Sequence, residues 1–259
     1  MNELPTLATF SQIVADPRFL LGVGIAVLSG AVRGFSGFGS ALIYVPLMSA
    51  VYGPKIGAVT FLLVDFVTGL AFVASAMRQA NWREVIPIAV FAIAAAQFGT
   101  LILQYAEPTT LRWLISITVL VIVPVLASGW RYTGKPHVLI TIGVGILAGL
   151  LGGAVQISGP PVLIYWLGSP HGVNTVRANF IAYFFLFAIG LVVTYFFRGL
   201  LTANILALTV LFAPLHILAM WGGTKLFHLA TEKTYRRVAY VIVLLAGLAA
   251  MPIFDAWLR

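Results

Sequence analysis

The chain has 259 residues, of which 61% are hydrophobic and 8% charged, and its mean hydropathy is +1.05. A water-soluble fold of this length has too little interior to bury so much apolar surface, so the composition excludes that class and indicates a polytopic membrane protein. The absence of cysteine excludes disulfides, thiolate metal sites and cysteine nucleophiles.

The formal net charge is +8, but the basic residues stand singly or in pairs in short loops between apolar segments. The positive-inside rule produces this distribution, which also suits anionic lipid headgroups, so we expect membrane lipid and no nucleic acid as a partner. The first eighteen residues lack the basic start of a secretory signal peptide, and no cleavage is expected.

Eight apolar segments follow along the chain, taking about 20 apolar residues as one crossing. They lie at 19–52, 56–76, 85–105, 111–130, 138–168, 176–197, 202–224 and 236–257. The first and fifth are longer than one crossing and are interrupted by glycine, and the fifth also by Pro160 and Pro161. Each is either one kinked span or a pair of half-helices. The pattern predicts an all-α polytopic membrane protein in which these two segments are broken or re-entrant helices.

The two halves of the chain resemble each other. GAVRGFSGFGSALIY, from Gly30 to Tyr44, is similar to GAVQISGPPVLIY, from Gly153 to Tyr165, and each half holds four apolar segments. We infer duplication of a roughly 120-residue unit. The predicted organisation is an N-terminal tail at 1–18, repeat 1 at 19–130, a linker at 131–137 and repeat 2 at 138–259.

The basic residues give a prediction of topology. If all eight segments cross the membrane once, its two faces receive equal numbers of basic residues. If the first and fifth segments instead return to the face from which they entered, one face receives nine basic residues and the other five. This bias favours six crossings plus two re-entrant hairpins, with both termini outside and the two repeats inverted relative to each other.

The stretch from Gly30 to Pro46 is the most unusual part of the first segment, because its glycines lower helix stability by about 1 kcal/mol each relative to alanine. We predict that the backbone opens here. Lipid offers no partner for freed backbone groups, so broken helices at membrane depth usually line a substrate site. The alternative is a glycine face that lets two helices pack closely.

Arg33 lies within this stretch, and an arginine at membrane depth is costly unless it is paired or faces water. Its planar guanidinium has five donors that suit carboxylate, sulfonate or phosphate oxygens, so it is a candidate anion clamp. The alternatives are an arginine that snorkels to the interface and one permanently paired with an acid such as Asp65.

The second half-helices would begin near Gly37 and Ser158, where free N–H groups and the positive ends of helix dipoles favour an anion. Asn179 could line the same cavity or bond to a neighbouring helix. The predicted substrate-binding residues are Arg33, Gly34, Ser36, Gly37, Gly39, Ser40, Gln156, Ser158, Gly159 and Asn179.

Asp65 has no basic residue at helical spacing, and is either the partner of Arg33 or a proton-exchanging group. His216 follows Pro214 and is either a proton carrier or a satisfied buried side chain. The histidines and acids form no cluster for metal or catalysis, so we expect no metal, no cofactor and no enzyme. A GxxxxGK[ST] motif is also absent.

The chain resembles the TauE/SafE family, also called toluene sulfonate uptake permeases, over nearly its whole length. The likeness rests on Gly34, Gly37, Gly39, Pro46, Pro54 and Ala58 in the first half and on Gly152, Gly153, Gly159 and Ala178 in the second. The chain departs from the family pattern at Ser40, Pro160, Pro161 and Asn179, so the substrate of better-known relatives is not carried over. The resemblance implies secondary transport of a small organosulfur or other organic anion, of the sulfite, sulfonate or sulfoacetate class, coupled to protons or sodium.

Together these observations predict a secondary transporter in the cytoplasmic (inner) membrane that holds a small anion between its two inverted halves. One alternative is a non-transporting scaffold subunit whose glycines serve only as helix contacts. Another is a transporter of a non-sulfur carboxylate. The sequence leaves the coupling ion, the direction of transport and a homo-oligomer open.

Overall fold

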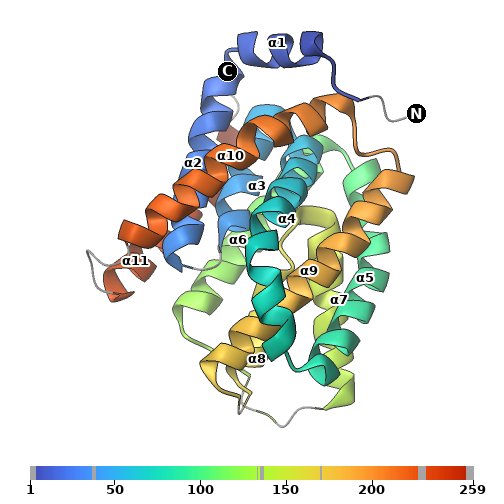
Figure 1. Cartoon of the computed structure of the whole chain (residues 1–259), viewed down its shortest axis with the longest axis vertical. Coiled ribbons are helices and arrows are strands. Elements are labelled where there is room, and N and C mark those ends of the chain that lie inside the picture. The colour runs from blue at the N-terminus through green and yellow to red at the C-terminus, as the bar shows by residue number, and fades with distance from the viewer. Residues whose placement is uncertain are drawn as a thin grey trace. The chain divides into compact units, whose positions relative to one another are not determined.

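A computed structural model describes residues 4–36, 39–132, 134, 137–169, 171–226 and 232–254, and within these ranges every regular element is a helix (Figure 1). The helices are α1 Leu7–Ala15, α2 Arg18–Ser36, α3 Ser40–Tyr52, α4 Pro54–Gln79, α5 Trp82–Tyr105, α6 Pro108–Ala127, α7 Val138–Val155, α8 Gly159–Leu167, α9 Val173–Phe197, α10 Ala203–Leu226, α11 Glu232–Ala249 and the 3-10 helix η2 Pro252–Phe254.

Each predicted apolar segment corresponds to one helix or to two consecutive helices. The first segment is divided into α2 and α3 and the fifth into α7 and α8, so both predicted interruptions are real breaks. Pro54 and Pro108 are the first residues of α4 and α6, where a missing N–H costs no helical hydrogen bond. Hydrophobic runs ended by glycine and proline therefore fix the helix boundaries closely.

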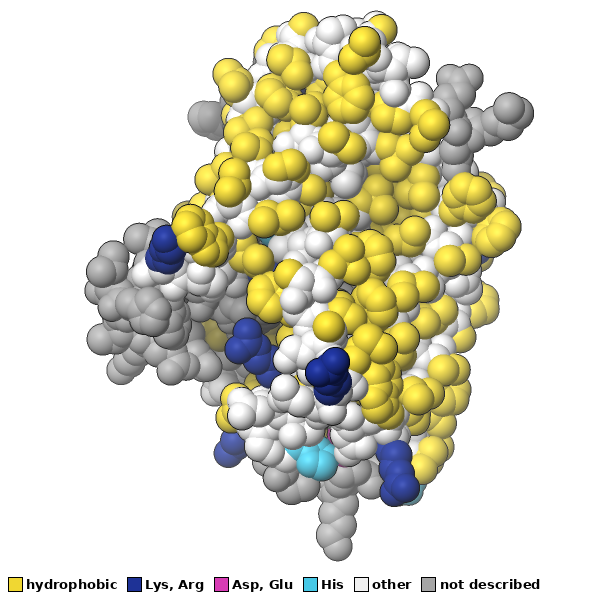
Figure 2. All heavy atoms as spheres, viewed as in Figure 1, with side chains coloured by type: hydrophobic (Ala, Val, Ile, Leu, Met, Phe, Trp, Pro, Cys, Tyr) yellow, Lys and Arg dark blue, Asp and Glu magenta, His cyan; other side chains and the backbone are white. Residues whose placement is uncertain are grey.

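Among the residues that the structure describes, six helices are long and apolar enough to cross a membrane, namely α4, α5, α6, α7, α9 and α10. Six is also the predicted number of crossings, but the set of helices differs from the predicted one. It includes α7, from the fifth segment, and it lacks α11, from the eighth, because the described apolar part of α11 is shorter. Figure 2 shows hydrophobic side chains spread widely over one face, as expected for a surface in contact with lipid. The re-entrant course of the first and fifth segments and the inversion of the repeats stay predictions.

Helix α1 lies in the region that the sequence assigned only to a tail. Its first turn is closed by a capping box between Thr6 and Thr9, and it meets α2 at an angle of 90°. At the bend, the Arg18 guanidinium forms an ion pair with Asp16 at 2.6 Å. The helix is too short to satisfy a crossing-length criterion, which is why hydropathy alone did not detect it.

The chain forms two compact units. Unit 1 comprises Met1–Thr68, Glu107–Val123 and Arg198–Arg259, and unit 2 comprises Gly69–Ala106 and Pro124–Phe197. Each unit takes helices from both predicted repeats: α2, α3 and α10 belong to unit 1, and α5, α7, α8 and α9 to unit 2.

In unit 1, α2 packs against α10 through glycine. A Cβ atom added at Gly30 or Gly34 would collide with the backbone carbonyl of His216 or Met220. These two glycines therefore permit a close helix contact, which is the packing role that the sequence analysis held as the alternative. After them, α2 ends at Ser36 and α3 begins at Ser40.

Unit 2 contains the same kind of contact between α7 and α5. Added Cβ atoms at Gly149 and Gly153 would collide with the backbone of Ala92 and Ala96. In both units, two glycines four residues apart in the first half of the broken segment face a neighbouring backbone. The alignment of the two repeats, in which Gly30 corresponds to Gly153, stays a prediction.

Alanine substitution on the two faces of α7 gives a direct test of this packing. Gly149→Ala should destabilise the protein by about 1–3 kcal/mol, because the new methyl group overpacks the contact with α5. Gly143→Ala is the matched control, since an added Cβ there meets nothing within 4 Å, and it should be neutral or slightly stabilising. Thermal denaturation of the purified variants measures both effects, and equal stabilities would contradict the contact.

Candidate anion site

The break in unit 1 begins where α2 ends at Ser36 and ends where α3 begins at Ser40. Gly39 caps α3 with a φ of 91°, in the left-handed region that glycine tolerates best. No side chain caps this end, so the first N–H groups of α3, at Ser40 and Ala41, have no partner within the helix. They add to the positive end of the helix dipole. Gly37 and the side chain of Ser36 lie outside the described residues.

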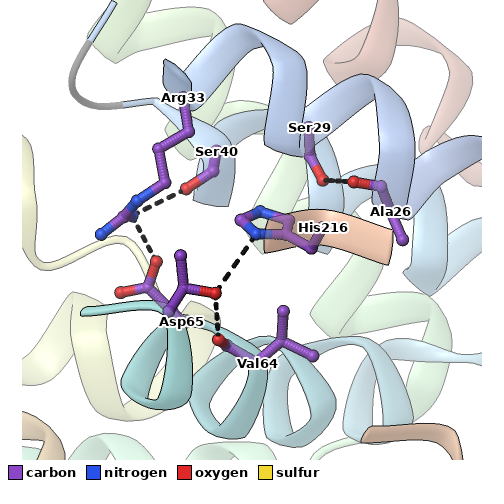
Figure 3. Close-up of polar contacts among 8 residues, drawn as sticks. Ala26, Ser29, Arg33, Ser40, Val64, Asp65 and His216 are labelled. Atoms are coloured by element: carbon purple, nitrogen blue, oxygen red, sulfur yellow. Dashed lines mark hydrogen bonds and ion pairs between the residues drawn. The ribbon is translucent and has the colours of Figure 1, made fainter. Parts of the chain in front are cut away.

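Arg33 lies in the last turn of α2, beside the beginning of α3 (Figure 3). Its Nη1 group donates a hydrogen bond to Ser40 Oγ at 3.1 Å and forms a short ion pair with the carboxylate of Asp65, which α4 carries. The Arg33 and Asp65 side chains are 22% and 16% exposed. Arg33 is therefore paired with an acid at the break, the arrangement in which an arginine at membrane depth is least costly.

The guanidinium of Arg33 has N–H donors that make no hydrogen bond with the described residues. Both of its hydrogen bonds start from Nη1, and within the described part of the chain Nη2 and Nε donate to no other group. A guanidinium has five N–H donors in one plane. The remaining edge of the fork can therefore bind two oxygens of an anion while Nη1 stays near Asp65.

His216 belongs to the same region of unit 1. It is completely buried, and its Nδ1 lies 3.4 Å from Thr68 Oγ1. The Thr68 hydroxyl donates to the Val64 carbonyl at 2.7 Å, so its only hydrogen is used and the ring nitrogen must be the donor. Figure 3 shows His216 on α10 next to the turn of α4 that carries Asp65. Within the described residues, Nε2 of His216 has no hydrogen-bond partner.

The break in unit 2 runs from Gln156 to Ser158. Gln156 has a φ of 58°, the only positive φ that the described non-glycine residues show. The strain of this left-handed conformation is about 1–2 kcal/mol. Two hydrogen bonds offset this strain. The backbone N–H of Gln156 donates to the carbonyl of Gly152 at 3.1 Å, and the side-chain Nε2 donates to Tyr195 OH at 2.8 Å.

The beginning of α8 offers fewer backbone donors than we predicted. Ser158 provides no side-chain cap, and Pro160 and Pro161 in the first turn have no N–H. Asn179, on α9, accepts a hydrogen bond from the backbone N–H of Asn81 at 2.6 Å through Oδ1. The Asn179 oxygen therefore bonds to a neighbouring helix end, which was the predicted alternative to lining a cavity. Its Nδ2 group has no hydrogen-bond partner within the described residues.

The structure thus brings the predicted residues together in two groups. Unit 1 holds Arg33, Gly34, Gly39, Ser40 and Asp65, with His216 joined through Thr68, and unit 2 holds Gln156, Ser158, Gly159 and Asn179. Because the groups belong to different units, the single shared site stays a prediction. Sequence reasoning missed Thr68, Tyr183 and Tyr195. The spacing of Thr68 from Val64 and of Tyr183 from Asn179, four residues in each case, could have indicated their shared helix faces.

The described residues form six apolar helices of crossing length, two interrupted segments and an arginine–carboxylate pair at one interruption, which define a polytopic membrane protein. The profile of the family described as "Sulfite exporter TauE/SafE" matches residues 22–250, and the chain belongs to this family. It is therefore a multi-pass protein of the cell membrane and a member of a transporter family.

One curated relative is named "Probable sulfite/organosulfonate exporter TauE" and comes from Cupriavidus necator. It is 24% identical to this chain over 251 residues, which are 91% of this chain and 96% of the relative. No solved structure gives a significant match.

Proposed function

We propose that the protein is a secondary transporter that moves a small sulfur oxoanion or organosulfonate across the cell membrane. The observation that carries the proposal is the Arg33 guanidinium, which lies at the uncapped beginning of α3 with part of its donor fork unused. A positive side chain and a positive helix end at one point favour an anion. The name of the Cupriavidus relative supports sulfite or an organosulfonate as substrate and export as the direction.

Asp65 gives this site a means of coupling. Without substrate, its carboxylate neutralises Arg33. When an anion approaches, two negative groups compete for one guanidinium, and their repulsion disfavours binding unless Asp65 gains a proton or a sodium ion. A cation that binds Asp65 and an anion that binds Arg33 would therefore favour each other, and this reciprocity is the basis of coupled transport.

A thermal-shift screen of the purified full-length protein tests the proposal. The ligands are sulfite, thiosulfate, taurine, isethionate, sulfoacetate, acetate and phosphate, each at two pH values. Binding to the folded state stabilises it by about 2.7 kcal/mol when the free ligand is at 100 times its Kd. We expect sulfite or a sulfonate to give the largest shift, and larger shifts at the lower pH.

The scaffold alternative keeps some support, because Gly30 and Gly34 do act as helix contacts. A scaffold has no reason to bind these ligands, so an absence of stabilisation by every anion at both pH values would favour it. Stabilisation by acetate above all sulfur anions would instead favour a carboxylate transporter.

A further inference from the structure

Three buried side chains, one on α8 and two on α9, have hydrogen-bond donors without a partner among the described residues. Trp166 Nε1, Asn179 Nδ2 and the Tyr183 hydroxyl make no hydrogen bond with the part of the chain that the structure describes, and all three residues are 0% exposed. Burial of an unpaired polar group is unfavourable, so most such groups in folded proteins have a partner. Three within one region call for a physical reason.

The three residues form one patch within unit 2. Asn179 and Tyr183 are four residues apart on α9 and therefore share a helix face. The ring of Trp166, on α8, meets the ring of Tyr183 edge to face, with the ring centroids 6.2 Å apart. The Tyr183 hydroxyl also lies near Ser158, at the break before α8, but their geometry does not make a hydrogen bond.

Packing explains the Tyr183 ring but not its hydroxyl group. The ring stacks on Phe187, with centroids 5.7 Å apart and planes inclined by 17°, and it meets Phe184 as well. A phenylalanine would make the same contacts. The hydroxyl is therefore not required for the fold as the structure shows it.

The chemistry of the patch is that of a donor surface. An indole N–H and an amide NH₂ can only donate, and the acceptor atom of the Asn179 amide is already used by Asn81. We propose that Trp166, Asn179 and Tyr183 form a neutral-donor subsite for the head group of an oxoanion that carries no proton, such as a sulfonate. This inference rests on the proposed function, because it assumes that the protein binds a small anion.

The subsite would confer selectivity between similar tetrahedral anions. The sulfonate group itself, including that of isethionate, carries no hydrogen at neutral pH, so three donors can satisfy its three oxygens. Inorganic phosphate keeps at least one hydroxyl, which needs an acceptor. Neither the indole nor the amide nitrogen provides one, and a Tyr183 oxygen that accepted from the phosphate hydroxyl would turn its own hydrogen away from the anion. A buried group left unpaired reduces affinity strongly, so phosphate should be rejected.

The test uses the purified full-length protein and its Tyr183→Phe variant, with isethionate and phosphate as probes. In the absence of ligand, we expect the variant to have a melting temperature equal to or above that of the unsubstituted protein, because an unpaired buried hydroxyl has been removed. Its Kd for isethionate should rise about tenfold, as expected for one lost hydrogen bond to a charged group. The preference for isethionate over phosphate should fall.

Tyr44→Phe is the matched control. Tyr44 is also 0% exposed, but its hydroxyl donates to Thr60 at 3.3 Å within unit 1. This variant should melt at a slightly lower temperature and keep its Kd for isethionate. A Tyr183→Phe variant that melts at a lower temperature and keeps its Kd would show that the hydroxyl has a structural partner and would overturn the subsite.

Asn179→Asp provides a second variant that does not depend on the tyrosine. It keeps an oxygen for Asn81 but replaces the donor with a negative charge, so the Kd for isethionate should rise by more than for Tyr183→Phe. An unchanged Kd would count against the subsite. If Arg33→Ala abolishes binding while Tyr183→Phe and Asn179→Asp do not affect it, only the subsite is wrong. If the unsubstituted protein binds none of the sulfur anions, the proposed function itself is wrong.

Discussion

Arg33→Ala should abolish both the anion-dependent stabilisation of the purified protein and its transport activity. The substitution removes the only positive charge at the beginning of α3 that the structure describes, together with the donors that Ser40 and Asp65 leave unused. Loss of a bidentate guanidinium contact to an anion should weaken binding by about a hundredfold or more. Titration of sulfite or isethionate against the melting temperature measures the change.

The single variant has a second effect that must be separated from the first. Without Arg33, the carboxylate of Asp65 is left unpaired in a mostly buried position, and breaking such a pair typically costs about 3–5 kcal/mol. The double variant Arg33→Ala/Asp65→Asn removes both charges and should recover much of this stability. It should still fail to bind the anion. Binding of normal strength by a stable double variant would show that Arg33 is a structural residue only.

Asp65→Asn should have the opposite effect on binding. Its amide no longer competes with the anion for Arg33, so the Kd for the anion at neutral pH should fall about tenfold. In the unsubstituted protein, affinity should increase as pH falls, because protonation of Asp65 releases the guanidinium. The variant should bind equally well across the pH range and transport more slowly, because the coupling group is absent.

The other titratable group in this cluster is His216, so it needs its own control. Its Nδ1 donates to Thr68, and an asparagine places its NH₂ group at a similar position. His216→Asn should therefore keep the pH dependence of anion binding. If Asp65→Asn retains this dependence and His216→Asn loses it, the coupling role belongs to the histidine and our account of Asp65 is wrong.

The sequence predicted the positions of the helices well, because their boundaries follow from physical signals that are local. Apolar runs of crossing length end at Pro54, Pro108 or glycine, and both long segments contain residues that cannot continue a helix comfortably. The breaks before α3 and α8 could be anticipated for this reason. The sequence also offered the ion pair between Arg33 and Asp65 as one of the alternatives for each residue, because membrane burial leaves few ways to compensate a charge.

The roles of individual glycines could not be predicted in the same way. Gly30 and Gly34 face the backbone of α10, whereas Gly39 caps a helix in the left-handed region, and both roles select glycine. Only the neighbouring helix distinguishes them. Gln156 is a related case, since a left-handed glutamine is not recognisable until Tyr195 is seen to hold its side chain.

Arg112 shows a further limit of sequence reasoning. The positive-inside rule treats it as a charge at a membrane face, but it is only 7% exposed. Its Nε donates to the carbonyl of Ala250 at 3.0 Å, just beyond the end of α11. A guanidinium at the negative end of a helix dipole stabilises that end, and the contact joins residues too far apart in sequence for local patterns to reveal it.

Anion flux in proteoliposomes tests the central claim most directly. Vesicles containing the unsubstituted protein, loaded with sulfite or isethionate, should release it in a saturable manner that a proton or sodium gradient alters. Vesicles containing the Arg33→Ala/Asp65→Asn variant, reconstituted to the same amount, should release it no faster than protein-free vesicles. Equal flux through both proteins, or flux through neither, would contradict a transporter that holds its substrate at Arg33.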